Sequence, residues 1–278
     1  YNNVMKNKDV LPHTIKTFSL TTTLLDIINS NEEDKTDVVL AKYLIDHIYE
    51  LQEKSVYDIA DETFTSRSSV QRFFKRIGFD SYSKVKLSLL ESIIHGKRYY
   101  QFYKQDSFVN NYNEDLISLI HEMSEFSQSE QLDHFVDLIH SSRTVVLNFS
   151  ECSTSAPYEF QEALVYLNKD IRLVTNSTIN KDFLSSLTYE DTFITLSMSG
   201  NYAIATLNEV AQMDTNKVLI SLNNSKILSD TYDKIITFSH NNMTYDYIQN
   251  GMRNAYTIYG FSYLFDLILN KYFTKYSD

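Results

Sequence analysis

The sequence is poor in several residue types that define special classes of protein. Its 278 residues include one Cys, two Pro, five Gly and no Trp. A single Cys cannot form an internal disulfide, so a disulfide scaffold is excluded and a reducing compartment, the cytoplasm, is expected. Because Gly and Pro are scarce and 43% of the residues are apolar, collagen-like and wholly disordered chains are excluded as well.

Long apolar runs are also absent. No run reaches the roughly 20 residues that a membrane-spanning helix needs, and the first ten residues, YNNVMKNKDV, lack the apolar core of a signal peptide. We therefore expect no membrane partner. The length suits two domains better than one, and the apolar content is sufficient for ordinary hydrophobic cores.

The net charge of -11 hides an uneven distribution. Residues 65–109 hold nine basic and three acidic residues, whereas residues 1–64 hold six basic and twelve acidic residues. Residues 110–278 hold ten basic and twenty-one acidic residues. One short cationic window inside an acidic chain indicates a module that meets phosphate groups, although charge alone fits a solvated basic helix face equally well.

Two short helices joined by a tight turn are predicted around this window. Ser55 followed by Asp58 has the spacing of a capping box, Ser66 can cap a second helix, and Gly78 can end it. About four residues separate the two helices, which is the plan of a helix-turn-helix, although any small helical bundle offers similar spacing. The cap, the turn and the local positive charge together favour the helix-turn-helix.

The second predicted helix has an apolar face and a polar face. The apolar face consists of Val70, Phe73, Phe74 and Ile77. Arg, Ser and Gln side chains on the other face are able to read base edges, and Lys side chains suit phosphate oxygens. The expected contacts with duplex operator DNA are Ser66, Arg67, Ser68, Ser69, Gln71, Arg72, Lys75 and Arg76, with Lys84 and Lys86 from the next helix.

The second half of the chain alternates apolar strands with helices. The expected strands are 144–149, 171–174, 192–196, 218–222 and 235–238, with helices near 155–168, 179–187, 202–213 and 225–232 between them. A long helix, 114–141, is expected before the first strand, and an amphipathic helix, 252–272, ends the chain. This order predicts a doubly wound α/β domain with a mostly parallel five-stranded sheet. We place a helix-turn-helix domain at 18–97, a linker at 98–112 and the α/β domain at 113–278.

Hydroxyl-rich loops follow the first and third predicted strands. They read Ser150-Glu151-Cys152-Ser153 and Ser197-Met198-Ser199-Gly200-Asn201. In doubly wound folds ligands bind at the carboxyl ends of the strands, where small hydroxyl residues and helix N-termini favour an anion such as phosphate. The alternative is that Ser and Asn only cap the following helices.

The stretch 59–79, IADETFTSRSSVQRFFKRIGF, resembles the N-terminal domain of RpiR-type transcription regulators. That family carries a Ser-led recognition helix with a Thr-Val-x-Arg-Phe core, and here Ser69 stands in place of the Thr. The resemblance covers roughly residues 20–95. It implies an all-α DNA-binding domain.

The loop Ser197-Met198-Ser199-Gly200 resembles the Ser-x-Ser-Gly-x-Thr loop of sugar isomerase (SIS) domains, which in RpiR-type regulators sense a phosphorylated sugar. The resemblance implies that Ser153, Ser197 and Ser199 hold the phosphate. Two positions depart from the pattern, because Glu151 lies in the first loop and Tyr202 replaces a phosphate-binding Thr. The full set of expected ligand residues is Ser150, Ser153, Ser197, Ser199, Gly200, Asn201 and Ser225.

The expected function is therefore DNA-binding transcription regulation of sugar metabolism, modulated by a sugar phosphate, in a homodimer or homotetramer that is not an enzyme. No cofactor is expected, and the seven His residues show no spacing suited to a metal site. One alternative is a phosphosugar isomerase or lyase, in which Glu151, Glu159 or Glu162 would act as the base. Another is a regulator whose altered loops sense nothing.

Overall fold

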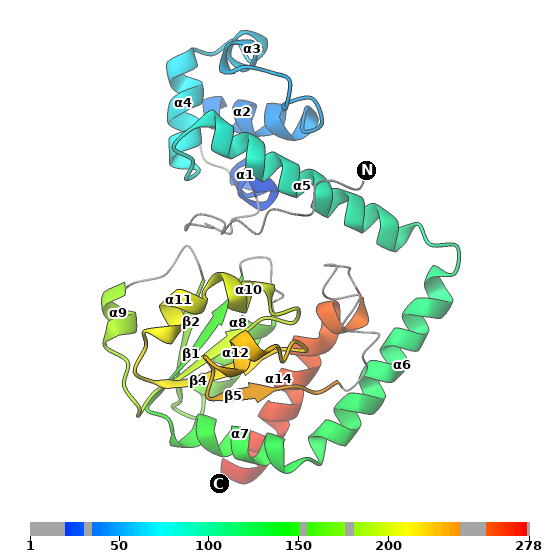
Figure 1. Ribbon diagram of the computed structural model, residues 1–278, viewed down its shortest axis with the longest axis vertical. Helices are drawn as coiled ribbons and strands as arrows, with labels where there is room; N and C mark the ends of the chain where they lie inside the picture. Colours follow the sequence, from blue (N-terminus) through cyan, green and yellow to red (C-terminus); the bar gives the residue numbers. More distant parts are fainter. Residues whose placement is uncertain (1–19, 31–34, 151–154, 176–180, 240–253, 277–278) are drawn as a thin grey trace.

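The N-terminal part of the chain forms a helical domain. The computed structural model (Figure 1) describes residues 20–30, 35–150, 155–175, 181–239 and 254–276. Within them, no helix combines the length and the apolar character that crossing a membrane requires. The helical domain contains α1 (Leu20–Asn29), α2 (Lys35–Asp46), α3 (Val56–Glu62), α4 (Arg67–Arg76) and α5 (Tyr82–Tyr103).

The predicted cap signals start and end these helices. The Ser55 hydroxyl accepts a hydrogen bond from the Asp58 amide at 3.3 Å, and the Asp58 carboxylate accepts one from the Ser55 amide at 2.7 Å, so the capping box is complete. Ser66 caps α4, and Gly78 adopts φ +91° just after it. Both helices of the helix-turn-helix are thus fixed at their first residues by local hydrogen bonds.

The helical domain has a hydrophobic core of its own, drawn from all five helices between Leu20 and Leu89. Val70, Phe73 and Phe74 of α4 are buried in this core, with exposed fractions of 2% or less. Phe74 also stacks on Tyr82 of α5, with ring centroids 5.3 Å apart. Burial on this side of α4 leaves its opposite side for solvent.

The residues expected to form a linker are mostly helical. The helix α5 continues to Tyr103, and four residues, 104–107, separate it from α6 (Phe108–Ser127). Aromatic side chains hold this corner: the ring of Phe102 is perpendicular to the rings of Phe108 and Tyr112, which stack on each other 5.2 Å apart. The sequence did not predict these helices at 98–112, because polar and apolar residues do not alternate there with a helical period.

The rest of the chain forms the predicted α/β domain. Its five strands are all parallel and lie in the order β2-β1-β3-β4-β5. The strands are β1 (Thr144–Phe149), β2 (Asp170–Val174), β3 (Thr192–Leu196), β4 (Asn216–Ile220) and β5 (Lys234–Ile236). The helices are α7 (Glu130–Ser141), α8 (Ala156–Val165), α9 (Lys181–Ser185), α10 (Asn201–Ala205), α11 (Leu207–Ala211), α12 (Lys226–Ser229) and α14 (Ala255–Tyr276).

Helices cover both faces of this sheet, as Figure 1 shows. Alternate residues of β1 divide between two cores, since Val145 and Leu147 pack with α6, α7, α8 and α14, while Val146 packs with α9, α10, α11 and α12. The doubly wound prediction is therefore confirmed. Every strand was placed to within about two residues, because continuous apolar runs are typical of strands buried on both faces.

Two predicted helices are each divided in the structure. The expected helix 114–141 is broken after Ser127, where Ser129 caps α7 by accepting a hydrogen bond from the Leu132 amide at 3.3 Å. The expected helix 202–213 is broken at Thr206, whose hydroxyl donates to the Tyr202 carbonyl at 3.0 Å. In both places a hydroxyl side chain competes with the backbone for helical hydrogen bonds, as Ser and Thr commonly do.

A buried carboxylate ties together the amino ends of β1 and β3. Asp191 is completely buried and accepts hydrogen bonds from the Arg143 guanidinium at 2.6 and 3.0 Å. It also accepts from the Thr144 and Thr188 amides at 3.2 and 2.9 Å. Burial alone would raise the pKa of the Asp191 carboxyl, but these donors hold the pKa below its ordinary value of 3.8.

Replacing Asp191 by Asn is expected to lower the free energy of unfolding by about 3 kcal/mol, because the change leaves buried donors unmatched. Urea unfolding at pH 7 measures this. Because the pKa of Asp191 is lower in the folded than in the unfolded state, its ionised carboxylate stabilises the fold at a pH above the unfolded-state pKa. The difference in unfolding free energy between wild type and variant should therefore narrow as the pH falls below about 4. Glu190→Gln is the matched control, since exposed Glu190 also faces Arg143, at 3.5 Å, and should cost less than about 1 kcal/mol.

Candidate nucleic-acid interface and ligand-binding loops

The helix α4 presents its polar side to solvent. Arg67, Gln71 and Lys75 are all exposed, as are Ser66, Ser68, Arg72, Arg76 and Lys84, while Ser69 and Lys86 are half-buried. The Ser66 hydroxyl accepts from the Ser69 amide at 3.1 Å, and the Ser68 and Ser69 hydroxyls lie within 2.9 Å of it. The start of α4 therefore carries a compact group of three hydroxyls beside exposed cations.

The predicted cations differ in their contacts with the protein. Arg76 pairs with Asp37 of α2, and Lys84 pairs with Asp80 at 2.7 Å. Lys86 donates to the Gln52 carbonyl at 2.6 Å, which anchors α5 to the residues after α2. The Lys75 side chain makes neither an ion pair nor a hydrogen bond within the described residues. Unlike Lys84 and Lys86, it can therefore reach a DNA phosphate without first breaking a contact with the protein.

The turn between α3 and α4 contains an unusual aromatic residue. Phe64 has a φ of +53°, a conformation that costs a residue with a Cβ roughly 1–2 kcal/mol. Its side chain is 97% exposed, so packing does not compensate for this cost. The sequence did not predict this left-handed conformation, because the turn was inferred from the helix caps on either side and not from Phe64 itself.

The loop after β3 is built by local hydrogen bonds around Gly200. The Gly200 amide donates to the Ser197 carbonyl at 2.9 Å, and the Ser197 hydroxyl accepts from the Ala203 amide at 3.3 Å. The Ser199 hydroxyl accepts from the Asn201 amide at 3.3 Å. Among the described residues neither hydroxyl donates a hydrogen bond, so each can donate its proton to an anion.

A single amide side chain locks this loop to the next one. The Asn223 amide group donates to the Ser199 carbonyl at 3.0 Å and accepts from the Ser225 amide at 2.9 Å. Gly200 has φ +79°, and a Cβ placed on it would lie 2.6 Å from the Asn223 side chain. Only Gly fits here. Asn223 was not among the predicted site residues, although its place just beyond a buried strand was the available signal.

The other predicted ligand residues have different environments. Ser150 ends the described part of the first loop and is half-buried, whereas Ser153 and Glu151 lie outside the described residues. The Ser225 hydroxyl is buried and has no hydrogen-bond partner within the part of the chain that the structure describes. An unpaired buried hydroxyl costs about 1–3 kcal/mol unless another group satisfies it.

Tyr202, which stands where a phosphate-binding Thr was expected, turns into the protein. Its hydroxyl donates to buried Asn148 of β1 at 2.8 Å, and Asn148 donates to the Thr195 hydroxyl at 3.3 Å. Tyr232 donates to the same Thr195 hydroxyl at 3.0 Å, and burial raises the pKa of Tyr232 to about 12. The Tyr202 side chain is thus buried in the domain interior and does not point out of the loop.

The carboxylates considered for an enzyme are engaged or exposed. Glu159 accepts a hydrogen bond from the Ser155 hydroxyl at 2.6 Å, and Glu162 is exposed on α8. Over the described ranges, no three His, Cys, Asp or Glu side chains come together in a way that could hold a metal ion. His140 stacks on Tyr276 instead, with ring centroids 3.6 Å apart.

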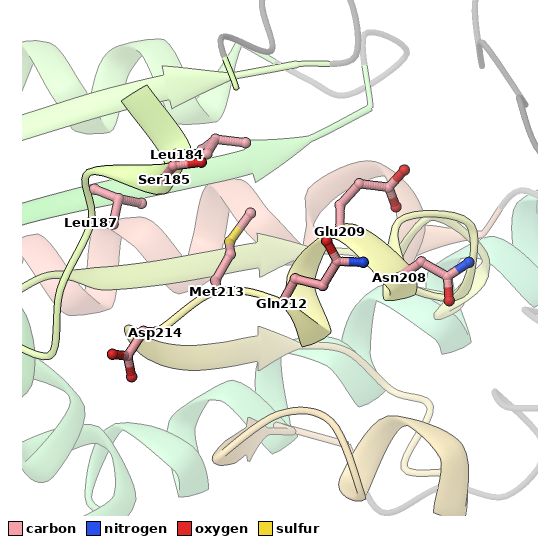
Figure 2. Close-up of a pocket in the computed structure, with 8 residues that line it drawn as sticks. All are labelled: Leu184, Ser185, Leu187, Asn208, Glu209, Gln212, Met213 and Asp214. Atoms are coloured by element: carbon pink, nitrogen blue, oxygen red, sulfur yellow. The ribbon is translucent and has the colours of Figure 1, made fainter. Parts of the chain in front are cut away.

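A pocket of about 460 Å³ lies between α9 and α11 (Figure 2). Leu184, Leu187 and Met213 supply its apolar part, and Glu209 and Asp214 bring negative charge. None of its eight lining residues is basic, and none belongs to the predicted ligand loops. The two carboxylates make it unsuitable for a phosphate dianion, because like charges repel.

The described geometry defines a class of protein, in which a capped helix-turn-helix domain is joined to a doubly wound α/β domain. Residues 22–95 match the family model "Helix-turn-helix domain, rpiR family". The N-terminal part of this chain is therefore similar to helix-turn-helix domains of the rpiR family, as its motif predicted. A search of curated proteins gives no match.

Solved structures with similar folds include two regulators and a protein with an inferred isomerase function. NanR of Vibrio vulnificus, complexed with ManNAc-6P, is 16% identical over 92% of both chains, with a TM-score of 0.42. The sugar isomerase domain of an RpiR transcription factor from Sphaerobacter thermophilus is 14% identical over 62% of this chain and 92% of its own, with a TM-score of 0.45. A Methanococcus jannaschii protein, whose structure inferred a 3-hexulose-6-phosphate isomerase function, is 14% identical over 58% and 90%, with a TM-score of 0.41.

Replacing Phe64 by Gly is expected to raise the free energy of unfolding by about 0.5–1 kcal/mol. The change removes the cost of the left-handed conformation, and the extra freedom of Gly in the unfolded chain offsets part of the gain. Thermal unfolding followed by circular dichroism measures it. Phe64→Ala is the control, because it keeps the strain and removes only an exposed ring. A loss above about 1 kcal/mol in that control would show that the ring is packed in solution.

Proposed function

We propose that this protein is a transcription regulator that binds operator DNA through α4 and responds to a phosphorylated sugar held by the α/β domain. The observation that carries the first half is the exposed polar side of α4, whose basic, hydroxyl and amide side chains suit the major groove. The match of residues 22–95 to the rpiR helix-turn-helix family supports the same conclusion. Its proposed location is the cytoplasm, where duplex DNA is accessible.

The proposed DNA contacts fall into two groups by their chemistry. The phosphate backbone is suited by Lys75, Lys84, Lys86 and the capped start of α4 at Ser66, while Ser68 and Ser69 can meet either phosphate oxygens or base edges. Arg67, Gln71, Arg72 and Arg76 have the donors and acceptors that read base edges. In this scheme Arg76, Lys84 and Lys86 exchange their present protein partners for DNA on binding.

We propose that the regulator acts as a homodimer or a homotetramer, so that two copies of α4 reach successive major grooves about 34 Å apart. Exposed apolar side chains on both long helices support an association surface. They are Leu87, Leu90 and Ile94 on α5, and Val109, Ile117 and Ile120 on α6. We propose that these side chains form the surface through which two copies associate.

We assign residues 18–97 to the DNA-binding domain and 113–278 to the ligand-binding domain, with 98–112 joining them. The separate cores support this division, since the core of the helical domain ends at Leu89 and the cores of the α/β domain begin at Leu119. Most of the joining segment is helical, with aromatic contacts between α5 and α6.

The proposed ligand site lies at the carboxyl ends of β1 and β3. These neighbouring strands form the point where the strand order reverses, and ligands of doubly wound folds bind at that point. Ser197, Ser199 and Gly200 follow β3, and Ser150 and Ser153 follow β1 in the sequence. Asn201 and Ser225 complete the proposed set, and the unpaired Ser225 hydroxyl is an available donor for a phosphorylated sugar.

Replacing Lys75 by Ala is expected to weaken binding to every duplex and to make the slope of log K against log[salt] shallower by about 1, because one phosphate contact is lost. Gln71→Ala should instead weaken the preferred duplex and relax the preference at one base pair. Fluorescence anisotropy on a duplex selected from a random pool measures both. Lys226→Ala removes an equal charge from the α/β domain and is the control. Unchanged binding by both α4 variants would reject the DNA interface.

A titration of hexose and N-acetylhexosamine 6-phosphates is expected to find one that changes operator affinity by about 5- to 150-fold, and operator DNA should change the affinity for that sugar by the same factor. Anisotropy and calorimetry measure the two sides. The double variant Ser197→Ala and Ser199→Ala should bind DNA normally and lose the response. If no sugar phosphate binds the wild-type protein, the α/β domain is not a sensor of this class.

A further inference from the structure

An aromatic residue of α3 lies against the first residue of α4. The Arg67 guanidinium lies over the Tyr57 ring, with its central carbon 4.0 Å from the ring centroid. Tyr57 is 57% exposed, so its ring is not a core residue of the helical domain. The contact is a cation–π interaction on the surface that carries the proposed DNA contacts.

Both members of the pair are attached to backbone that is already fixed. Tyr57 is the second residue of α3, whose start is held by the capping box of Ser55 and Asp58. Arg67 is the first residue of α4 and follows its cap, Ser66. With the backbone fixed at both positions, the Arg67 side chain is still free to change rotamer, and the contact with the Tyr57 ring restricts that motion.

Arg67 also differs from Arg76 at the far end of the same helix. Arg76 forms an ion pair with Asp37, which offsets its charge and directs its side chain toward the protein. Arg67 makes no ion pair within the described residues, and its charge faces only an aromatic ring. Stacking uses the flat face of the guanidinium and leaves its five N–H donors, which lie in the plane, available at the edge.

We infer that Tyr57 is a positioning residue for Arg67, holding the guanidinium plane so that its edge meets a guanine of the operator. Guanine offers two acceptors, O6 and N7, to a bidentate Arg in the major groove. The inference rests on the proposed DNA-binding function of α4 and adds to it a residue on α3 and a base preference. Fixing the side chain beforehand lowers the entropy lost on binding, which is the usual gain from preorganisation.

The test uses the full-length protein and a duplex selected from a random pool by the wild-type protein. Anisotropy gives the Kd for that duplex and for variants in which each G·C pair is replaced by A·T. The protein variants are Tyr57→Phe, Tyr57→Leu, Arg67→Ala and the double variant Tyr57→Leu with Arg67→Ala. Thermal unfolding of each variant accompanies the binding curves, and Tyr57→Phe keeps the ring while removing the hydroxyl.

We expect Tyr57→Leu to raise the Kd for the selected duplex about two- to fivefold, the size of an exposed cation–π interaction. It should also reduce discrimination at the one G·C pair that Arg67→Ala makes indifferent. In the Arg67→Ala background the same change should have no further effect, and Tyr57→Phe should bind as the wild type does. A merely structural role would leave base discrimination intact.

Three results would overturn the inference. Equal losses from Tyr57→Leu with and without Arg67 would mean that Tyr57 touches DNA independently. A loss in Tyr57→Phe as large as in Tyr57→Leu would assign the effect to the hydroxyl. Wild-type affinity and discrimination in Tyr57→Leu would show that the stack is irrelevant to recognition. These outcomes leave the proposed function standing, whereas failure of the wild-type protein to select any duplex would reject both.

Discussion

The burial of Val70, Phe73 and Phe74 is the constraint on which the reading surface depends. These side chains set the rotation of α4 about its own axis, because a helix with one apolar stripe has one orientation that hides it. Every residue on the other side is then committed to solvent. The core of a small helical domain thus determines, without touching DNA, which side chains are available to meet it.

In the α/β domain the corresponding constraint is the order of the strands. The chain adds β2 on one side of β1 and then returns to place β3 on the other side. The carboxyl ends of β1 and β3, which are more than forty residues apart in sequence, are thereby brought to the same edge of the sheet. The Asn223 side chain then joins the loop after β3 to the loop after β4 through two hydrogen bonds.

Much of this organisation follows from local patterns in the sequence. The box of Ser55 and Asp58 and the cap at Ser66 depend on residues three apart, so one sequence is enough to place them. Buried parallel strands are recognisable because both of their faces are apolar. The Asn223 contact, the inward turn of Tyr202 and the stack of Tyr57 on Arg67 depend instead on residues that only the folded chain brings together.

The corner between α5 and α6 has a mechanical consequence. Phe102 is 8% exposed there and contacts Phe108 and Tyr112 on the second helix. Opening the corner would return much of this aromatic surface to water, at a cost of about 2 kcal/mol or more. These ring contacts couple the two helices. A shift of α6 where it packs on α14 would therefore be transmitted through the corner to α5 and to the helical domain that carries α4.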